Sequence, residues 1–276
     1  MAAVLGTNMA SLWASKNLQT AQTNMASSVE RLSSGLRINR SKDDATGLAV
    51  SNYITQQING AKQGLRNLND GVSLVQTADG ALSSVTEMAQ RMLTLATQAS
   101  SGVLSDDQIA AIGTECTGLL TAIAAIKTRT EVNATPIFEG EAISIKSSNV
   151  TDDVVEISDS ALADFSDSTE FDALTEAVED LDSTTGQALI DAASAYITAI
   201  DTQRAELGSL QNQLDYSISN VSELSANLTS ARSNILDTDY ASETASLTKG
   251  QILQQAATAM LAQANQMPNV ILSLLK

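Results

Sequence analysis

A mostly apolar side chain recurs every three or four residues, without a break, from Leu189 to Ile235. The positions are Leu189, Ala193, Tyr196, Ile200, Gln203, Leu207, Leu210, Leu214, Ser217, Val221, Leu224, Leu228, Ala231 and Ile235. This spacing gathers the side chains on one stripe of an α-helix, whereas a strand would alternate every two residues. A helix of this length spans about 70 Å at 1.5 Å per residue. The chain is therefore predicted to be built on very long helices.

A second long helix is predicted before it, with the stripe Ile54, Ile58, Ala61, Leu65, Leu68, Val72 and Val75, continued after a small phase shift by Leu82, Val85, Ala89, Met92 and Ala96. A turn follows at Ser100, and a capping box at Ser105–Gln108 opens a third helix that ends near Arg129. The chain contains only two prolines and 3% aromatic residues, which favours uninterrupted helices with an aliphatic interior.

The middle of the chain has a different pattern. Residues 142–145 and 154–157 alternate apolar and polar positions on either side of a turn, which predicts a β-hairpin. Between Ser147 and Gln203 there are fourteen Asp or Glu and no Lys or Arg. This acidic segment is interpreted as a solvated surface region with at most a short helix near 171–181. It lacks the spaced carboxylates of a calcium loop, so no metal site is expected.

The two ends of the chain are almost uncharged. Lys16 is the only charged residue from Met1 to Val29, and the last thirty residues carry only Lys249 and Lys276. A helix is predicted from about residue 7 to residue 36, and the C-terminal stretch has a heptad stripe. That stripe consists of Leu253, Ala257, Met260, Ala264, Met267, Ile271 and Leu274. Such helices are marginal alone, so we expect them to be buried against copies of the same protein.

Composition excludes several functions. The chain has no His and one Cys, Cys116, so the usual general base, most transition-metal sites and an intrachain disulfide are all absent, and no enzyme activity or cofactor is expected. The net charge of −17 argues against binding to nucleic acid or anionic membranes. The N-terminus has no basic region or long apolar run, and no span of 18 apolar residues occurs, so neither a Sec signal peptide nor a membrane span is expected.

The predicted fold is mainly α, with a nested order. Long, coiled-coil-like helices from both chain ends bracket one small β-hairpin region, so each domain is assembled from two separate parts of the sequence. An ordinary intracellular coiled coil would carry Glu and Lys beside its apolar stripe, and the terminal stripes here lack them.

Four motifs resemble those of bacterial flagellin. They are SSGLRINRSKDDATGLAVS at 33–51, DGVSLVQTADGAL at 70–82, ARSNILDTDYASE at 231–243 and ILQQAATAMLAQANQMP at 252–268, followed by SLLK at the end of the chain. The resemblance covers about residues 1–130 and 186–276. Because several separate motifs occur in the same order, the resemblance is far more specific than a heptad match.

The resemblance implies a structural subunit that self-assembles into the helical filament of the bacterial flagellum. It implies an axial coiled-coil domain lining the inner channel (1–42 and 235–276), a helical shaft domain (43–131 and 187–234) and a short variable surface region (132–186). The axial subunit-packing residues would be Leu5, Met9, Leu12, Met25, Val29, Leu32, Leu36, Leu253, Met260, Met267, Ile271 and Leu274. The terminal helices would fold on polymerisation.

Further partners are implied by the same resemblance. They are a flagellar export chaperone, which would bind the C-terminal end of a chain exported by the type III apparatus, and the filament cap and hook–filament junction proteins. The location implied is secreted, in the extracellular filament. Family members are also recognised by a host innate-immunity receptor, whose contacts would fall on Arg91, Leu95 and Glu115. Leu93 and Thr94 depart from the common family residues there, and our main interpretation of Arg91 and Glu115 is contact between subunits.

Three alternatives were considered. A hook–filament junction (hook-associated) protein would share flagellin-like ends but be present in few copies. A type III secretion tip or translocator protein would lack the motifs quoted above. An enzyme, including a flagellin with an inserted zinc protease, would need His residues that this chain does not have.

Overall fold

The computed structural model describes residues 7–149, 153–182 and 185–274, with side chains as far as residue 267 in the last range. The chain divides into two compact units, one formed by 1–56 with 227–276 and the other by 57–226. Each unit is described by itself. The division into axial, shaft and surface domains made from the sequence stays a prediction, because it follows family boundaries rather than contacts.

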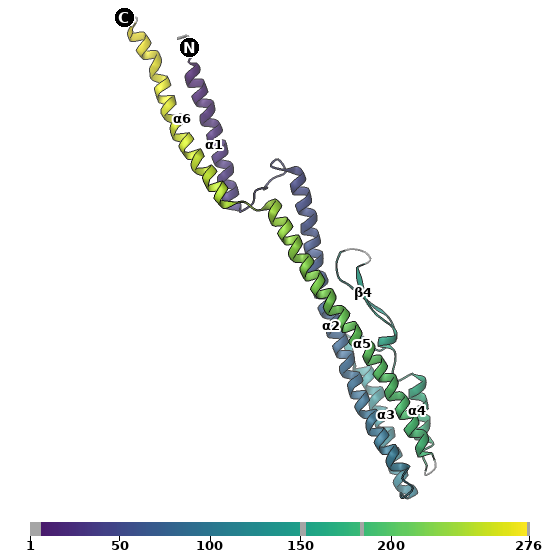
Figure 1. The fold of residues 1–276 in the computed structure, drawn as a ribbon. Helices are drawn as coiled ribbons and strands as arrows, with labels where there is room; N and C mark the ends of the chain where they lie inside the picture. The colour runs from purple at the N-terminus through teal and green to yellow at the C-terminus, as the bar shows by residue number, and fades with distance from the viewer. Residues whose placement is uncertain (1–6, 150–152, 183–184, 275–276) are drawn as a thin grey trace. The chain divides into compact units, whose positions relative to one another are not determined.

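In the first unit, helices α1 (Met9–Ser34) and α6 (Tyr240–Leu274) run antiparallel, side by side (Figure 1). The side chain of Asn8 caps the start of α1 by accepting a hydrogen bond from the backbone N–H of Ser11. Gly35 ends the helix in the left-handed conformation, with φ of 72°, and donates its N–H to the carbonyl of Arg31. The helix predicted from about residue 7 to residue 36 therefore ends at this glycine.

The connectors at the base of this pair are held by short polar contacts. An isolated antiparallel bridge joins Leu36 to Asp237. The Asp44 carboxylate then accepts the N–H of Gly47 at 2.8 Å and so caps the start of α2 (Ala45–Ala99). This hydrogen bond, followed by one from the side chain of Thr46, lowers the pKa of Asp44. The connector before α2 is therefore charged and caps the helix that follows it.

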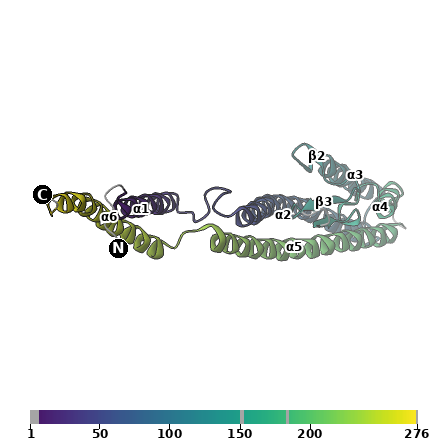
Figure 2. The same cartoon turned by 90° about the horizontal axis from the view of Figure 1, so that it is seen from above.

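The second unit contains most of α2 and α5 (Gly186–Leu236), together with α3 (Asp106–Arg129) and α4 (Thr169–Glu179). The helices pack side by side in both views (Figures 1 and 2). The predicted stripe of α5 is buried from Leu189 to Leu214, and again at Val221. The long helices and the capping box of α3 are confirmed.

The predicted hairpin is also confirmed, as β3 (Ile143–Lys146) and β4 (Val154–Ile157), paired antiparallel with Ile143 opposite Ile157. The strand end lies against α2, because Asn67 donates its side-chain N–H to the carbonyl of Lys146 at 3.0 Å. A second hairpin that the sequence did not predict, β1 (Glu131–Val132) and β2 (Thr135–Pro136), follows α3.

The acidic segment is more ordered than expected. Besides α4, the segment contains a 3-10 turn, η1 (Ser160–Leu162), which is hydrogen-bonded to α5. The buried hydroxyl of Tyr196 donates to the carbonyl of Phe165 at 3.1 Å, and Gln203 donates to the carbonyl of Ala163 at 2.9 Å. Burial raises the pKa of Tyr196. Two residues in the predicted stripe of α5, Tyr196 and Gln203, therefore hold this segment in place.

Among the residues described, α3 is the one helix that by length and composition could cross a membrane, with a mean hydropathy of 1.7 in its most apolar window. Its buried residues are Ile109, Ile112, Cys116, Leu120 and Ile123. They repeat every three or four positions along one face, while Asp106, Asp107 and Glu115 remain exposed. A core helix passes the same test of length and composition.

Candidate assembly interface on the terminal helix pair

Helices α1 and α6 meet through small side chains. Along α1 the buried residues are Ala14, Ala21 and Ser28, and along α6 they are Gly250, Ala257 and Ala264. Both sets repeat every seven residues, which is the heptad period of a coiled-coil contact. Because these side chains are small, the two backbones approach closely. We call these six residues the small-residue seam.

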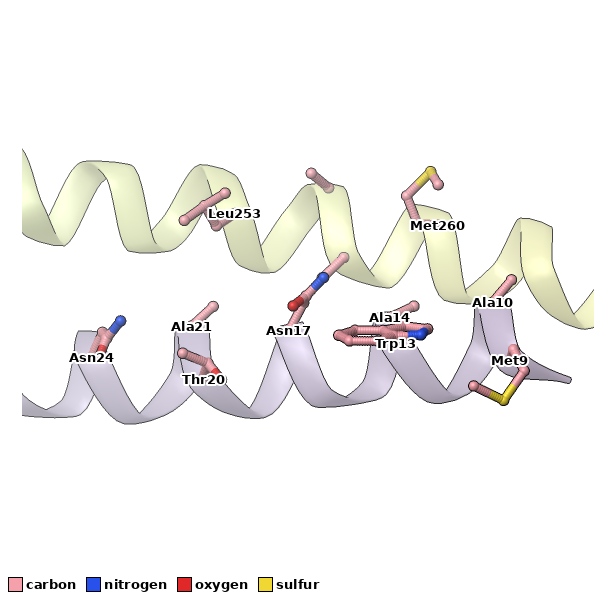
Figure 3. A pocket seen from close by; sticks show the side chains of 12 residues that line it. Met9, Ala10, Trp13, Ala14, Asn17, Thr20, Ala21, Asn24, Leu253 and Met260 are labelled. Atoms are coloured by element: carbon pink, nitrogen blue, oxygen red, sulfur yellow. The ribbon is translucent and has the colours of Figure 1, made fainter. Parts of the chain in front are cut away.

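Several large apolar residues of the pair lie beside this seam and remain exposed. Met9, Trp13, Leu253 and Met260 are 48%, 57%, 48% and 64% exposed, respectively. Together with small neighbours from both helices they line a groove of about 820 Å³. In Figure 3, Ala14 and Ala21 point from α1 toward α6. The intrachain contact thus uses the small residues and leaves a mostly apolar groove open.

The structure distributes the predicted axial residues in two ways. Exposed side chains occur at Met9, Leu12, Val29, Leu253, Met260 and Met267, and partly buried ones at Met25, Leu32 and Leu36. Leu5 lies outside the described residues, as do the side chains of Ile271 and Leu274. Within the part of the stripe whose side chains the structure describes, 253–267, the buried members are Ala257 and Ala264.

Sequence reasoning missed Trp13, which lies next to the predicted Leu12 and lines the groove. A usable signal was present, because Trp13 is the only Trp in the chain and sits in an almost uncharged segment. The ammonium of Lys16 lies 5.5 Å from the centre of its ring, a cation–π contact that leaves the ring exposed. A large exposed aromatic ring is typical of interfaces.

The base of the pair is polar. Arg31 and Glu243 approach to 3.7 Å across the two helices, and with Lys249 they line a smaller hollow of about 360 Å³. The contact surface therefore changes along the pair from charged at the base to apolar in the groove.

The three candidate receptor residues lie on α2 and α3. Arg91 and Glu115 form an exposed ion pair with an N–O distance of 2.8 Å. Leu95 is only 2% exposed and belongs to the core of the second unit. Of the three, only Arg91 and Glu115 have exposed side chains.

No group of three or more His, Cys, Asp or Glu in the described parts of the chain is arranged to hold a metal ion. Burial raises the pKa of the Cys116 thiol to about 11, so it stays protonated at neutral pH, unlike a catalytic thiolate.

Comparison with known proteins decides the family. The bacterial flagellin N-terminal helical region matches residues 5–142, and the bacterial flagellin C-terminal helical region matches residues 190–275. A flagellin of Halalkalibacterium halodurans is 38% identical over 99% of this chain and 100% of its own length. The chain belongs to the bacterial flagellin family.

Two other relatives agree with this assignment. A flagellin of Bacillus subtilis is 38% identical over 95% of both chains. The flagellar filament 33 kDa core protein of Treponema phagedenis is 33% identical over 99% of this chain and all of its own. A crystal structure of Bacillus cereus flagellin aligns with 60% of this chain and 94% of its own, with 26% identity and a TM-score of 0.49.

Membership of the flagellin family makes the chain a structural subunit of a flagellar filament and does not favour the hook–filament junction alternative. Flagellins are a structural family whose members polymerise, as the sequence motifs predicted for this chain. The terminal regions matched by the family include both helices that line the open groove.

Proposed function

We propose that the groove between α1 and α6 is the surface through which copies of this chain pack along the filament axis, and that the two helices become fully ordered only when neighbouring copies cover it. The observation that carries this proposal is the exposure of Met9, Trp13, Leu253 and Met260 on a pair whose own contact is made by small residues. Water-exposed apolar side chains of this size favour association with a matching apolar surface.

The energetics support coupled ordering and assembly. Helices α1 and α6 contain 26 and 35 residues, and ordering each residue costs roughly 1–2 kcal/mol of backbone entropy. A seam of Ala, Ser and Gly removes little apolar surface from water, whereas burying one Leu, Met or Trp side chain contributes about 1.5–3 kcal/mol. Contacts with neighbouring copies would therefore supply much of the stabilisation that the pair alone lacks.

The proposed domain roles follow the family boundaries. Residues 1–42 and 235–276 form the axial domain around the inner channel, residues 43–131 and 187–234 form the shaft, and residues 132–186 form a short surface region. The acidic composition of 147–203 suits a surface that stays in water, because carboxylates without cations are costly to bury.

The remaining partners are proposed on the strength of family membership. They are an export chaperone, the filament cap, the hook–filament junction proteins and, at Arg91 and Glu115, a host innate-immunity receptor or a neighbouring subunit. The proposed location is the extracellular filament. The proposed role is purely structural, without enzyme activity.

Electron microscopy of the purified full chain after salt-induced polymerisation tests the proposal. We expect helical filaments from the unmodified chain. A chain lacking residues 270–276 should keep the circular dichroism of a folded helical protein but form no filaments. Filaments of normal length from the shortened chain would contradict the proposed role of the C-terminal helix.

A further inference from the structure

Helix α6 continues through a proline. Pro268 lies inside α6 (Tyr240–Leu274), and proline has no backbone N–H. In an α-helix, the N–H at position 268 would donate to the carbonyl oxygen four residues earlier, which belongs to Ala264. The helix therefore cannot supply the usual donor to Ala264, whose residue is only 6% exposed.

The missing donor comes from the other end of the chain. The Asn8 side-chain amide donates its N–H to the Ala264 carbonyl oxygen at 2.7 Å. The amide oxygen of the same side chain accepts the N–H of Ser11 at 3.1 Å and caps α1. Next to it, the Ser11 hydroxyl donates to the side-chain oxygen of Asn265 at 3.0 Å. Asn8 thus starts α1 and ties it to α6 at once.

This tie matters because the small-residue seam does not by itself define how the helices align. Its residues repeat every seven positions on both helices, so sliding one helix by a heptad, about 10.5 Å, again places small residues opposite small residues. At the base, the bridge between Leu36 and Asp237 sets the alignment. Toward the other end of the pair, the carbonyl of Ala264 has no helical N–H donor, because the residue four positions later is Pro268.

We propose that Pro268 and Asn8 together fix the register of the two helices, and we call this pair the register lock. The proline leaves the Ala264 carbonyl without a helical donor, and the Asn8 amide donates to that carbonyl only when α1 and α6 are correctly aligned. Asn8 and Pro268 are positioning residues, because they act by holding the two walls of the groove level with each other. The lock rests on the proposed function, in which neighbouring copies pack into the groove, because the register of the two helices sets the shape of that groove.

The register of the two helices can be measured with a disulfide between them. Because the side chains of Ser11 and Asn265 already meet, the pair Ser11→Cys and Asn265→Cys reports the correct register. The pair Ser11→Cys and Thr258→Cys reports a shift of one heptad. The effective concentration of each thiol pair is measured from its equilibrium with glutathione. Cys116 is left in place, because it is buried.

Four full-length backgrounds form a double-mutant cycle: unmodified, Asn8→Ser, Pro268→Ala and both. Serine at position 8 can still cap α1, but its side chain is too short to donate to the Ala264 carbonyl. Alanine at position 268 restores the helical N–H. In the Pro268 background, Asn8→Ser should lower the effective concentration of the 11–265 pair about fivefold, the equivalent of one net hydrogen bond, and raise that of the 11–258 pair. In the Pro268→Ala background, Asn8→Ser should change either value less than about twofold.

Equal effects of Asn8→Ser in the two backgrounds would overturn the lock, as would no effect in either. The thiol equilibria are measured in the monomer and in filaments. If the unmodified chain formed no filaments, the proposed function would fail, while the monomer cycle would still decide whether the lock exists.

Discussion

Gly64 of α2 lies directly against the backbone carbonyl of Ser147, so closely that a Cβ atom on Gly64 would stand 1.6 Å from that oxygen. Ser147 follows β3 and is itself buried at 2% exposure. Its N–H and hydroxyl both donate to the carbonyl of Asp153, each at 3.0 Å. The hairpin is thus seated on the helix backbone at a point where only glycine fits.

Replacing Gly64 by Ala should lift this end of the hairpin from α2. Because the obstacle is backbone rather than a flexible side chain, we expect a loss of about 1–3 kcal/mol in the free energy of unfolding, measured by guanidinium denaturation. Gly80→Ala on the same helix is the matched control, since a Cβ there meets nothing within 4 Å. It should be neutral or stabilising by up to about 1 kcal/mol. Similar destabilisation at both positions would show that the close contact is irrelevant.

Tyr196→Phe should destabilise the second unit without changing its shape. The substitution removes the hydroxyl that donates to the carbonyl of Phe165 and leaves that acceptor buried and unpaired, which costs about 1–3 kcal/mol. The control is Tyr216→Phe on the same helix, where the ring is 78% exposed and a change below about 0.5 kcal/mol is expected. Denaturation curves that did not distinguish the two variants would contradict this role of the hydroxyl.

The long helices were predictable because their signals are local and repeated. The stripe that begins at Leu189 and the capping box at Ser105 each report on a few turns of chain, and α5 and α3 form where these patterns predict them. The hairpin of β3 and β4 was predictable for the same reason. Its position on α2 was not, because a glycine such as Gly64 signals a close approach without identifying what approaches.

The contact between α1 and α6 was predicted less well. A heptad stripe identifies an apolar face but not its partner. Within one chain, α6 packs on α1 through alanines of that stripe, such as Ala257, which meet small residues such as Ala21, while its Leu and Met side chains in the described range stay exposed. The β1–β2 hairpin was missed because its turn uses Asn133 and Ala134, both with positive φ, in place of the usual Asn-Gly. The order of the acidic segment depends on Gln203, whose partners lie some forty residues away in the sequence.

Acid should loosen the start of α2. In the folded state the pKa of Asp44 is lowered, first by the hydrogen bond from the N–H of Gly47. The stabilisation from this cap is therefore present above the ordinary Asp pKa of about 4, and it is lost as the pH falls through and below that value. The protection of the Gly47 amide against hydrogen exchange, corrected for the intrinsic rate, should therefore fall between about pH 6 and about pH 3. Asp44→Asn keeps an oxygen acceptor but does not titrate in this range. In this variant, the protection of the Gly47 amide should therefore depend less on pH. An unchanged pH profile in that variant would assign the effect to another group, such as Asp43, whose pKa is also lowered.

Two substitutions on α6 should separate pairing within the chain from packing between chains. Met260→Ala removes a 64% exposed side chain from the groove and leaves the small-residue seam intact, so it should leave pairing of α1 with α6 unchanged. If neighbouring copies bury the methionine, its loss costs about 2 kcal/mol per subunit and raises the critical concentration for assembly about thirtyfold. Ala257→Leu instead forces a large side chain between the two backbones, and should weaken the pair itself as well as assembly. Sedimentation after polymerisation measures the critical concentration, and the disulfide equilibrium between cysteines placed at Ser11 and Asn265 measures pairing. A normal critical concentration for Met260→Ala would remove this part of the groove from the subunit interface.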